Sequence, residues 1–185
     1  MIGNRRPAAF VGLMALALGT GVAVSAPAHA AVAGILCTGW TYTTYSPGLT
    51  NTVQPTTVVD QGALNVIGPH SPTGSCLALG SGASSGTRDV TAQLNLSCNA
   101  ILTETGVETI NWNDGQSTSF TFTATAAHVG SNTVLTETGT VDSGEFVGDH
   151  VVETFTAPSA AFTDCETATG VTSLDYATVL TILPL

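Results

Sequence analysis

Carboxylates are the side chains most available for chemistry in this chain, because it holds thirteen acidic residues and no lysine. A pair of glutamates could hydrolyse a glycosidic bond, one acting as an acid and the other as a base or nucleophile. With so many scattered acids, however, a pair at catalytic distance is expected by chance. The glutamates that could form such a pair are Glu104, Glu108, Glu137, Glu145 and Glu153.

The histidines form no motif of their own. His70, His128 and His150 stand in neither H-E-x-x-H nor H-x-H spacing, so we expect them on loops or on the surface. A two-residue turn at residues 143–144 would place Glu137 opposite His150, which favours a cross-strand ion pair over a general-base dyad. No G-x-S-x-G nucleophile motif is present either. We therefore assign no catalytic residue, and these patterns favour a protein that is not an enzyme.

Calcium is the only cofactor that the acidic turns suggest, since turn oxygens can ligate it. No EF-hand spacing is present, and solvated acids are the favoured interpretation, so we expect no cofactor and no metal site. The candidate oxygen donors are Asn111, Asn113 and Asp114 in one turn, or Asp142, Glu145 and Asp149 in another.

Three aromatic residues could form a ligand platform. Trp40, Tyr42 and Tyr45 lie close together in the sequence, and exposed rings stack on sugars with little loss of side-chain entropy. Successive residues of a strand point to opposite faces, so some of these rings are expected to point inward.

The first thirty residues read as a cleavable secretory signal peptide. Arg5 and Arg6 precede an apolar run over residues 8–24, and Ala28-His29-Ala30 is a small-x-small cleavage site. Cleavage after Ala30 leaves residues 31–185 as a single secreted β-rich domain. No later apolar run is long enough to span a bilayer.

The charge of residues 31–185 excludes several partners. Arg88 stands alone against thirteen acids, a net charge near −12 before the termini are counted. Nucleic acid and anionic membrane surfaces are therefore excluded. The absence of lysine also excludes Schiff-base chemistry.

Four cysteines follow the leader: Cys37, Cys76, Cys98 and Cys165. An even number in an exported chain predicts two disulfides, and the lack of C-x-x-C spacing disfavours zinc. If successive strands alternate in direction, the pairing of Cys37 with Cys76 and of Cys98 with Cys165 ranks first of the three possibilities. A Greek-key crossover would change this ranking.

Strand patterns dominate the rest of the chain, which is rich in Thr, Val, Gly and Ser and shows no sustained 3.6-residue apolar period. Turn residues separate most of the candidates, so consecutive strands are expected to be antiparallel neighbours. The candidate strands cover approximately residues 35–45, 53–67, 89–98, 102–112, 117–128, 133–141, 146–156 and 171–183.

One hairpin can be assigned a register. A three-residue loop over Asn113 to Gly115, with a left-handed glycine as in a G1 bulge, puts Ile110 and Trp112 on the same face as Phe120 and Phe122. A two-residue loop would instead set the tryptophan opposite a serine. We predict the three-residue loop, with the aromatic face in the core.

Several segments resemble those of small secreted proteins common in Streptomyces and related actinobacteria. Besides the leader, these are Cys37-Thr38-Gly39, residues 45–50, residues 112–118, residues 139–149 and the closing Thr181-Ile182. They are turn and core signatures spread over most of residues 31–185. The resemblance implies an exported β-domain of actinobacterial origin and carries over no functional residue.

The sequence thus predicts an all-β fold: an antiparallel β-sandwich of about eight strands with two disulfides. An up-and-down β-barrel is the alternative, because residues 102–156 form a meander. The expected function is non-catalytic binding of an extracellular polymer, surface or partner protein. Two alternatives stay open, a secreted hydrolase of unfamiliar type and an inhibitor that presents a loop such as residues 69–86 to an extracellular enzyme.

Overall fold

Long β-strands make up most of the part of the chain that the structure, a computed structural model, describes: residues 33–66, 74–99 and 105–185. The predicted signal peptide, residues 1–30, lies outside the described residues. No helix in the described ranges is long and apolar enough to cross a membrane. The elements are β1 (Gly34–Leu49), β2 (Gln54–Leu64), β3 (Ser75–Leu79), β4 (Gly86–Leu96), β5 (Thr105–Trp112), β6 (Ser117–Val129), β7 (Asn132–Gly144), β8 (His150–Pro158), the 3₁₀ helix η1 (Ser159–Glu166) and β9 (Val171–Leu183).

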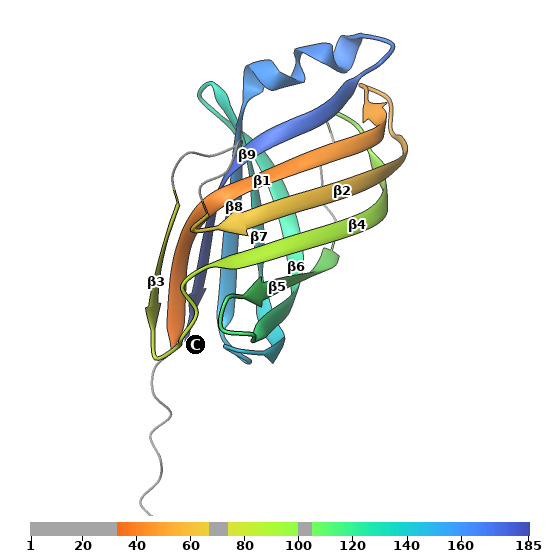
Figure 1. Cartoon of the computed structure of the whole chain (residues 1–185). Coiled ribbons are helices and arrows are strands. Elements are labelled where there is room, and N and C mark those ends of the chain that lie inside the picture. The colour runs from red at the N-terminus through yellow and green to blue at the C-terminus, as the bar shows by residue number, and fades with distance from the viewer. Residues whose placement is uncertain (1–32, 67–73, 100–104) are drawn as a thin grey trace, which may run out of the picture. The chain divides into compact units, whose positions relative to one another are not determined.

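Eight of these strands close into an antiparallel barrel (Figure 1). Each strand from β4 to β9 pairs with the next, and β2 pairs with both β1 and β4. The ring closes where β9 pairs with β1, from Thr44–Ser173 to Ile35–Ile182. The predicted sandwich is therefore wrong and the barrel alternative is correct. The two ends of the meander bond to each other, where a sandwich would leave them as edges of separate sheets.

A short strand, β3, was not among the predicted strands. The strands β2 and β3 pair with successive stretches of β1. β2 pairs with residues 39–46, and β3 pairs with residues 34–38. β3 runs outside the ring beside the N-terminal half of β1 (Figure 1). The disulfide between Cys37 and Cys76, the first-ranked pairing, ties the two strands together. Part of the loop that we assigned to an inhibitor is thus a strand, and residues 69–73 of it lie outside the described residues.

The helix η1 lies at one end of the barrel (Figure 1). Its Cys165 is buried in the apolar cluster at that end, and Phe162 packs against the same cluster. The second disulfide joins Cys165 to Cys98, just after β4, again in the first-ranked pairing. The cross-link therefore fixes the helix over the barrel end.

The β5–β6 hairpin has the predicted three-residue loop. Its register leaves Asn113 to Gly115 in the loop, and the glycine has a φ of +86°. Ile110, Trp112 and Phe120 are buried on the inner face, with Phe122 partly buried beside them. The predicted aromatic face is therefore part of the core.

The β7–β8 turn differs from the prediction. We placed a turn at residues 142–144, but β7 continues to Gly144 and residues 145–149 form the turn. Phe146 in this turn adopts a φ of +65° and is buried. Its ring packs edge-on against Trp112, with 6.2 Å between ring centroids. Burial of this ring explains why the turn lies later than its glycine and serine residues suggested.

The inner face of the barrel is apolar at both ends and polar in the middle. On β9, for example, Tyr176 belongs to one apolar cluster, Thr178 is polar, and Leu180 belongs to the other cluster. The same order recurs on most of the strands. We call the middle layer the polar belt; its members are Thr41, Thr43, Asp60, Arg88, Glu108, Glu137, Glu153 and Thr178.

The hairpin loop yields a first prediction. At Gly115 an added Cβ would meet no atom within 4 Å, so only the positive φ opposes a side chain. We expect Gly115→Ala to lower the free energy of unfolding by about 1 kcal/mol, whereas Gly115→Asn loses less because asparagine tolerates this conformation. Urea unfolding of both variants measures the difference. Equal losses would contradict the left-handed loop.

Candidate functional site

The barrel wall is weakest between β4 and β5. Their ladder holds only two residue pairs, Gly86–Trp112 and Thr87–Asn111, whereas β5 and β6 share a ladder along the whole of residues 105–111. Beyond those two pairs, both strands line a cavity of about 140 Å³. Val107 at its rim is exposed. The cavity therefore opens through the wall between these strands.

Most of the cavity wall is apolar. On β4, Val90, Ala92 and Leu94 face inward yet are only half-buried, because the cavity beside them is open. A cavity of about 150 Å³ can hold a molecule the size of benzene. The other apolar and aromatic lining residues are Tyr45, Val58, Leu96, Phe122, Leu135, Phe155 and Tyr176.

The polar end of the cavity is organised by Arg88. Its Nη1 donates to Glu108 Oε1 and, over 2.6 Å, to Glu153 Oε1. Its Nη2 donates to Thr41 Oγ1 over 2.8 Å, and its Cζ lies 4.9 Å from the centre of the Phe155 ring. The side chain is buried, so these contacts replace part of its lost hydration, while its Nε has no hydrogen-bond partner among the described residues. They account for both terminal nitrogens of the guanidinium.

Space for Arg88 depends on the absence of a side chain at Gly62. A Cβ at that position would lie 2.5 Å from the Arg88 Nε and 2.9 Å from its Cγ. The glycine therefore allows the Arg88 side chain to pass directly over the inner face of β2.

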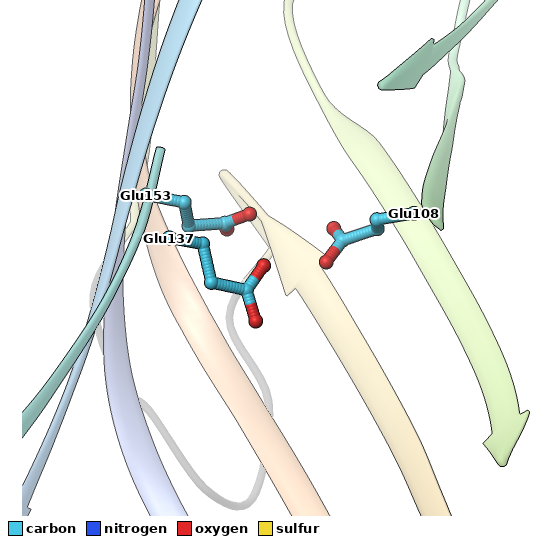
Figure 2. A group of neighbouring side chains, drawn as sticks. All are labelled: Glu108, Glu137 and Glu153. Atoms are coloured by element: carbon cyan, nitrogen blue, oxygen red, sulfur yellow. The ribbon is translucent and has the colours of Figure 1, made fainter. Parts of the chain in front are cut away.

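Three glutamates converge from three strands toward the same point (Figure 2). Glu108 comes from β5, Glu137 from β7 and Glu153 from β8, and one carboxylate oxygen of each lies within 4.8 Å of the others. All three are buried. The Oε2 atoms of Glu137 and Glu153 are buried and have no hydrogen-bond partner among the described residues.

Burial raises the pKa of two of these three carboxyl groups. The pKa of Glu137 is raised to about 9, first by burial and then by the carboxylates of Glu108 and Glu153. The pKa of Glu153 is raised to about 8, chiefly by burial, although Arg88 opposes this shift. Burial also raises the pKa of Asp60. Near neutral pH, Glu137 is therefore an acid that still holds its proton.

Hydroxyl groups complete the cavity beside Asp60. Thr43 Oγ1 donates to Asp60 Oδ1. The hydroxyls of Tyr45 and Tyr176 lie 3.2 Å apart, and burial raises the pKa of both. These groups offer hydrogen-bond donors and acceptors next to the apolar wall.

The glutamate cluster is a poor metal site. Divalent calcium or magnesium needs six or more oxygen ligands. Arg88 Nη1 already binds an oxygen of both Glu108 and Glu153, so the guanidinium lies where a metal ion would have to bind. Only Glu137 is left without an ion pair among the three.

Three of the six candidate calcium donors accept hydrogen bonds from other groups. Asn113 Oδ1 accepts from the backbone N–H groups of residues 84 and 85, and Asp114 Oδ1 accepts from that of Gln116. Asp142 Oδ2 accepts from Thr121 Oγ1. Neither predicted set lies at the cavity.

The aromatic residues predicted as a platform do not share one face. Tyr45 faces the barrel interior, where it lines the cavity. Trp40 and Tyr42 lie on the opposite face of β1 and are half-buried. Only Tyr45 therefore belongs to the site.

The predicted pair of Glu137 and His150 is wrong. Because the turn lies later than expected, Glu137 pairs with Glu153, and His150 pairs with Thr140. His128 and His150 are exposed, as expected, while His70 lies outside the described residues. Three of the five glutamates that we considered do meet, but Glu145 lies away from them and Glu104 is outside the described residues.

Arg88 and Asp60 were not recognised as site residues from the sequence. Strand alternation could have shown that acidic side chains point into the barrel. Asp60 lies two residues after buried Val58, and Glu153 lies between buried Val151 and Phe155. A charged residue that points inward from a strand needs a buried partner, and Arg88 is the only lysine or arginine after residue 6.

Removal of the guanidinium is expected to destabilise the barrel. We expect Arg88→Met to lower the free energy of unfolding by about 3–5 kcal/mol, because it leaves buried carboxylates uncompensated. Arg88→Lys keeps the charge but lacks the planar fork, so its loss should be smaller. Urea unfolding near neutral pH compares them. A methionine variant as stable as the wild type would show that the belt does not depend on Arg88.

The raised pKa values predict a pH dependence of stability. Glu137 and Glu153 bind more protons in the folded than in the unfolded chain between their ordinary pKa of 4.5 and about 8–9. Their contribution is therefore fully present below about pH 4.5 and is lost as pH rises toward 9. We expect Glu137→Gln to flatten this decline, measured by urea unfolding across that range. The exposed-site control Glu166→Gln should keep the wild-type slope; equal slopes for both variants would contradict the assignment.

Comparison with known proteins gives no match: no protein-family model, no curated protein and no solved structure matches this chain.

Proposed function

We propose that this protein is a secreted, non-catalytic binding protein that holds a small, mostly apolar molecule inside its barrel. The observation that carries the proposal is the cavity of about 140 Å³ between β4 and β5, with its apolar wall and polar end. Ligand sites are typically concave, mainly apolar and furnished with a few convergent polar groups. Secretion is part of the proposal and is supported by the leader pattern and the two disulfides.

A small ligand suits this geometry better than the polymer that the sequence suggested. Trp40 and Tyr42 are separated from Tyr45 by the barrel wall, so the three rings offer no common stacking surface. The cavity is the size of a single small ring. A longer molecule could place one end inside and extend outward past Val107.

A glycoside hydrolase is less well supported. Its two carboxyl groups stand roughly 5–9.5 Å apart with the sugar between them. Here the three glutamates lie with oxygens within 4.8 Å of one another, and Arg88 binds two of them. The carboxyl groups of Glu108 and Glu153 are therefore engaged by the arginine and are not free to act on a sugar.

Blocking the cavity tests this function. Benzyl alcohol serves as the probe because it combines a ring with one hydroxyl, and we expect a Kd of about 1 mM or tighter. Ala92 faces the cavity, so Ala92→Trp should abolish binding. Thr91→Trp adds the same bulk to the outer face of β4 and should bind normally. Titration calorimetry measures all three proteins.

Two results would refute the proposal. The first is an absence of benzyl alcohol binding to the wild type. The second is unchanged binding to the Ala92→Trp variant, which would place the probe outside this cavity.

A further inference from the structure

We infer that the polar end of the cavity selects a protonated amine, with Glu137 and Asp60 as the carboxylates that receive it. This inference rests on the proposed function and names the chemical class of its ligand. It follows from the imbalance of charge in the polar belt, from an unpartnered buried oxygen and from the charge of the whole domain.

Carboxylates outnumber cations in the belt. Asp60, Glu108 and Glu137 line the cavity together with Arg88, and Glu153 lies directly behind them. The guanidinium is already bound by Glu108 and Glu153. Two carboxyl groups at the cavity are therefore left without a cation, and a ligand that brings one positive charge would supply what they lack.

Glu137 is the group most clearly in need of a partner. It is 5% exposed, lines the cavity, and its Oε2 has no hydrogen-bond partner among the described residues. Its carboxyl group points into the space between the strands (Figure 2). A buried oxygen left without a hydrogen bond is unfavourable, and an ammonium N–H would satisfy it.

An ammonium group fits better than a metal ion or an anion. It has three N–H donors and needs no octahedral shell of oxygens. Glu137, Asp60 and the nearby hydroxyls of Thr43, Tyr45 and Tyr176 supply acceptors for those donors. A carboxylate ligand would meet repulsion from these acids, and the terminal nitrogens of Arg88 are already engaged. The remaining guanidinium donor, Nε, has no hydrogen-bond partner among the described residues and lies against Gly62 of β2.

The negative electrostatic potential of residues 31–185 also favours a cationic ligand. Residues 31–185 carry thirteen acids against a single arginine. Their summed potential concentrates cations near the surface and disfavours anions. An amine is therefore favoured both on approach and at the buried end of the cavity.

Uptake of an amine should release a proton from Glu137. In the free protein this carboxyl group holds its proton, because burial and the carboxylates of Glu108, Glu153 and Asp60 outweigh the attraction of Arg88. The incoming N–H groups would stabilise the ionised form, so the proton leaves to solvent. A neutral alcohol should release none.

Three ring compounds of matched size test the inference: benzylamine, benzyl alcohol and benzoate. We expect benzylamine to bind roughly tenfold more tightly than benzyl alcohol, and benzoate more weakly than either. Calorimetry in buffers of different ionisation enthalpy should show proton release with the amine alone. Glu137→Gln should remove most of the preference for the amine over the alcohol. Asp89→Asn removes a negative charge from the outer face of β4 and should leave the preference intact.

The possible failures can be told apart. Alcohol binding equal to or tighter than amine binding would overturn the inference and leave the proposed function standing. Tightest binding of benzoate would also overturn it, by assigning the recognition to Arg88. An unchanged preference in Glu137→Gln would remove Glu137 from the site. If none of the three compounds binds, the proposed function fails as well.

Discussion

The interior of this barrel depends on one guanidinium. Arg88 binds Glu108, Glu153 and Thr41, which reach it from three other strands. A buried carboxylate without a cation is strongly unfavourable, so the carboxyl groups of Glu108 and Glu153 can face each other in the interior only while Arg88 lies between them. Because no lysine is present and the other two arginines lie at positions 5 and 6, residues 31–185 hold no other lysine or arginine that could replace it.

The same constraint explains the form of the cavity. The polar belt divides the interior into two apolar halves, so the core cannot pack as a continuous hydrophobic layer. The half that contains Leu94, Leu96 and Phe122 borders the stretch where β4 and β5 are not paired. Its apolar side chains therefore line an open space, while the other half, around Phe120 and Trp112, is tightly closed. The cavity thus lies at the boundary between an unpaired wall and a charged layer.

Local features were predictable from the sequence, and non-local ones were not. The loop at Gly115 follows from neighbouring residues. Alternating strand direction ranked the observed disulfide pairings first of three, without determining them. Closure into a barrel depends on pairing between β1 and β9, more than a hundred residues apart, for which the sequence holds no local signal. The turn at Phe146 was misplaced for a related reason, because its position depends on a contact with Trp112 from another hairpin.

The candidate site could likewise be predicted only in part from the sequence. Glu108, Glu137 and Glu153 were recognised as possible chemistry, yet thirteen acids made any group of three unremarkable. What distinguishes these three is their inward phase on the strands, which places each beside buried apolar residues. Which residues of a strand point inward can be assigned once its register is known, as the hairpin of Trp112 illustrates. The three glutamates, however, come together only when the strands close into a barrel.

The belt also sets a limit on stability that bears on function. Buried ionic groups generally stabilise a protein less than apolar side chains of similar volume would. A barrel filled with leucine and valine in place of the belt would therefore be the more stable molecule, and it would have no polar end to its cavity. Two disulfides that close loops of 39 and 67 residues offset part of this deficit by restricting the unfolded chain. A ligand that satisfied Glu137 would offset more of it, because binding to the folded state alone adds to stability by mass action. In this fold the groups that weaken the core and the groups that would recognise the ligand are the same side chains.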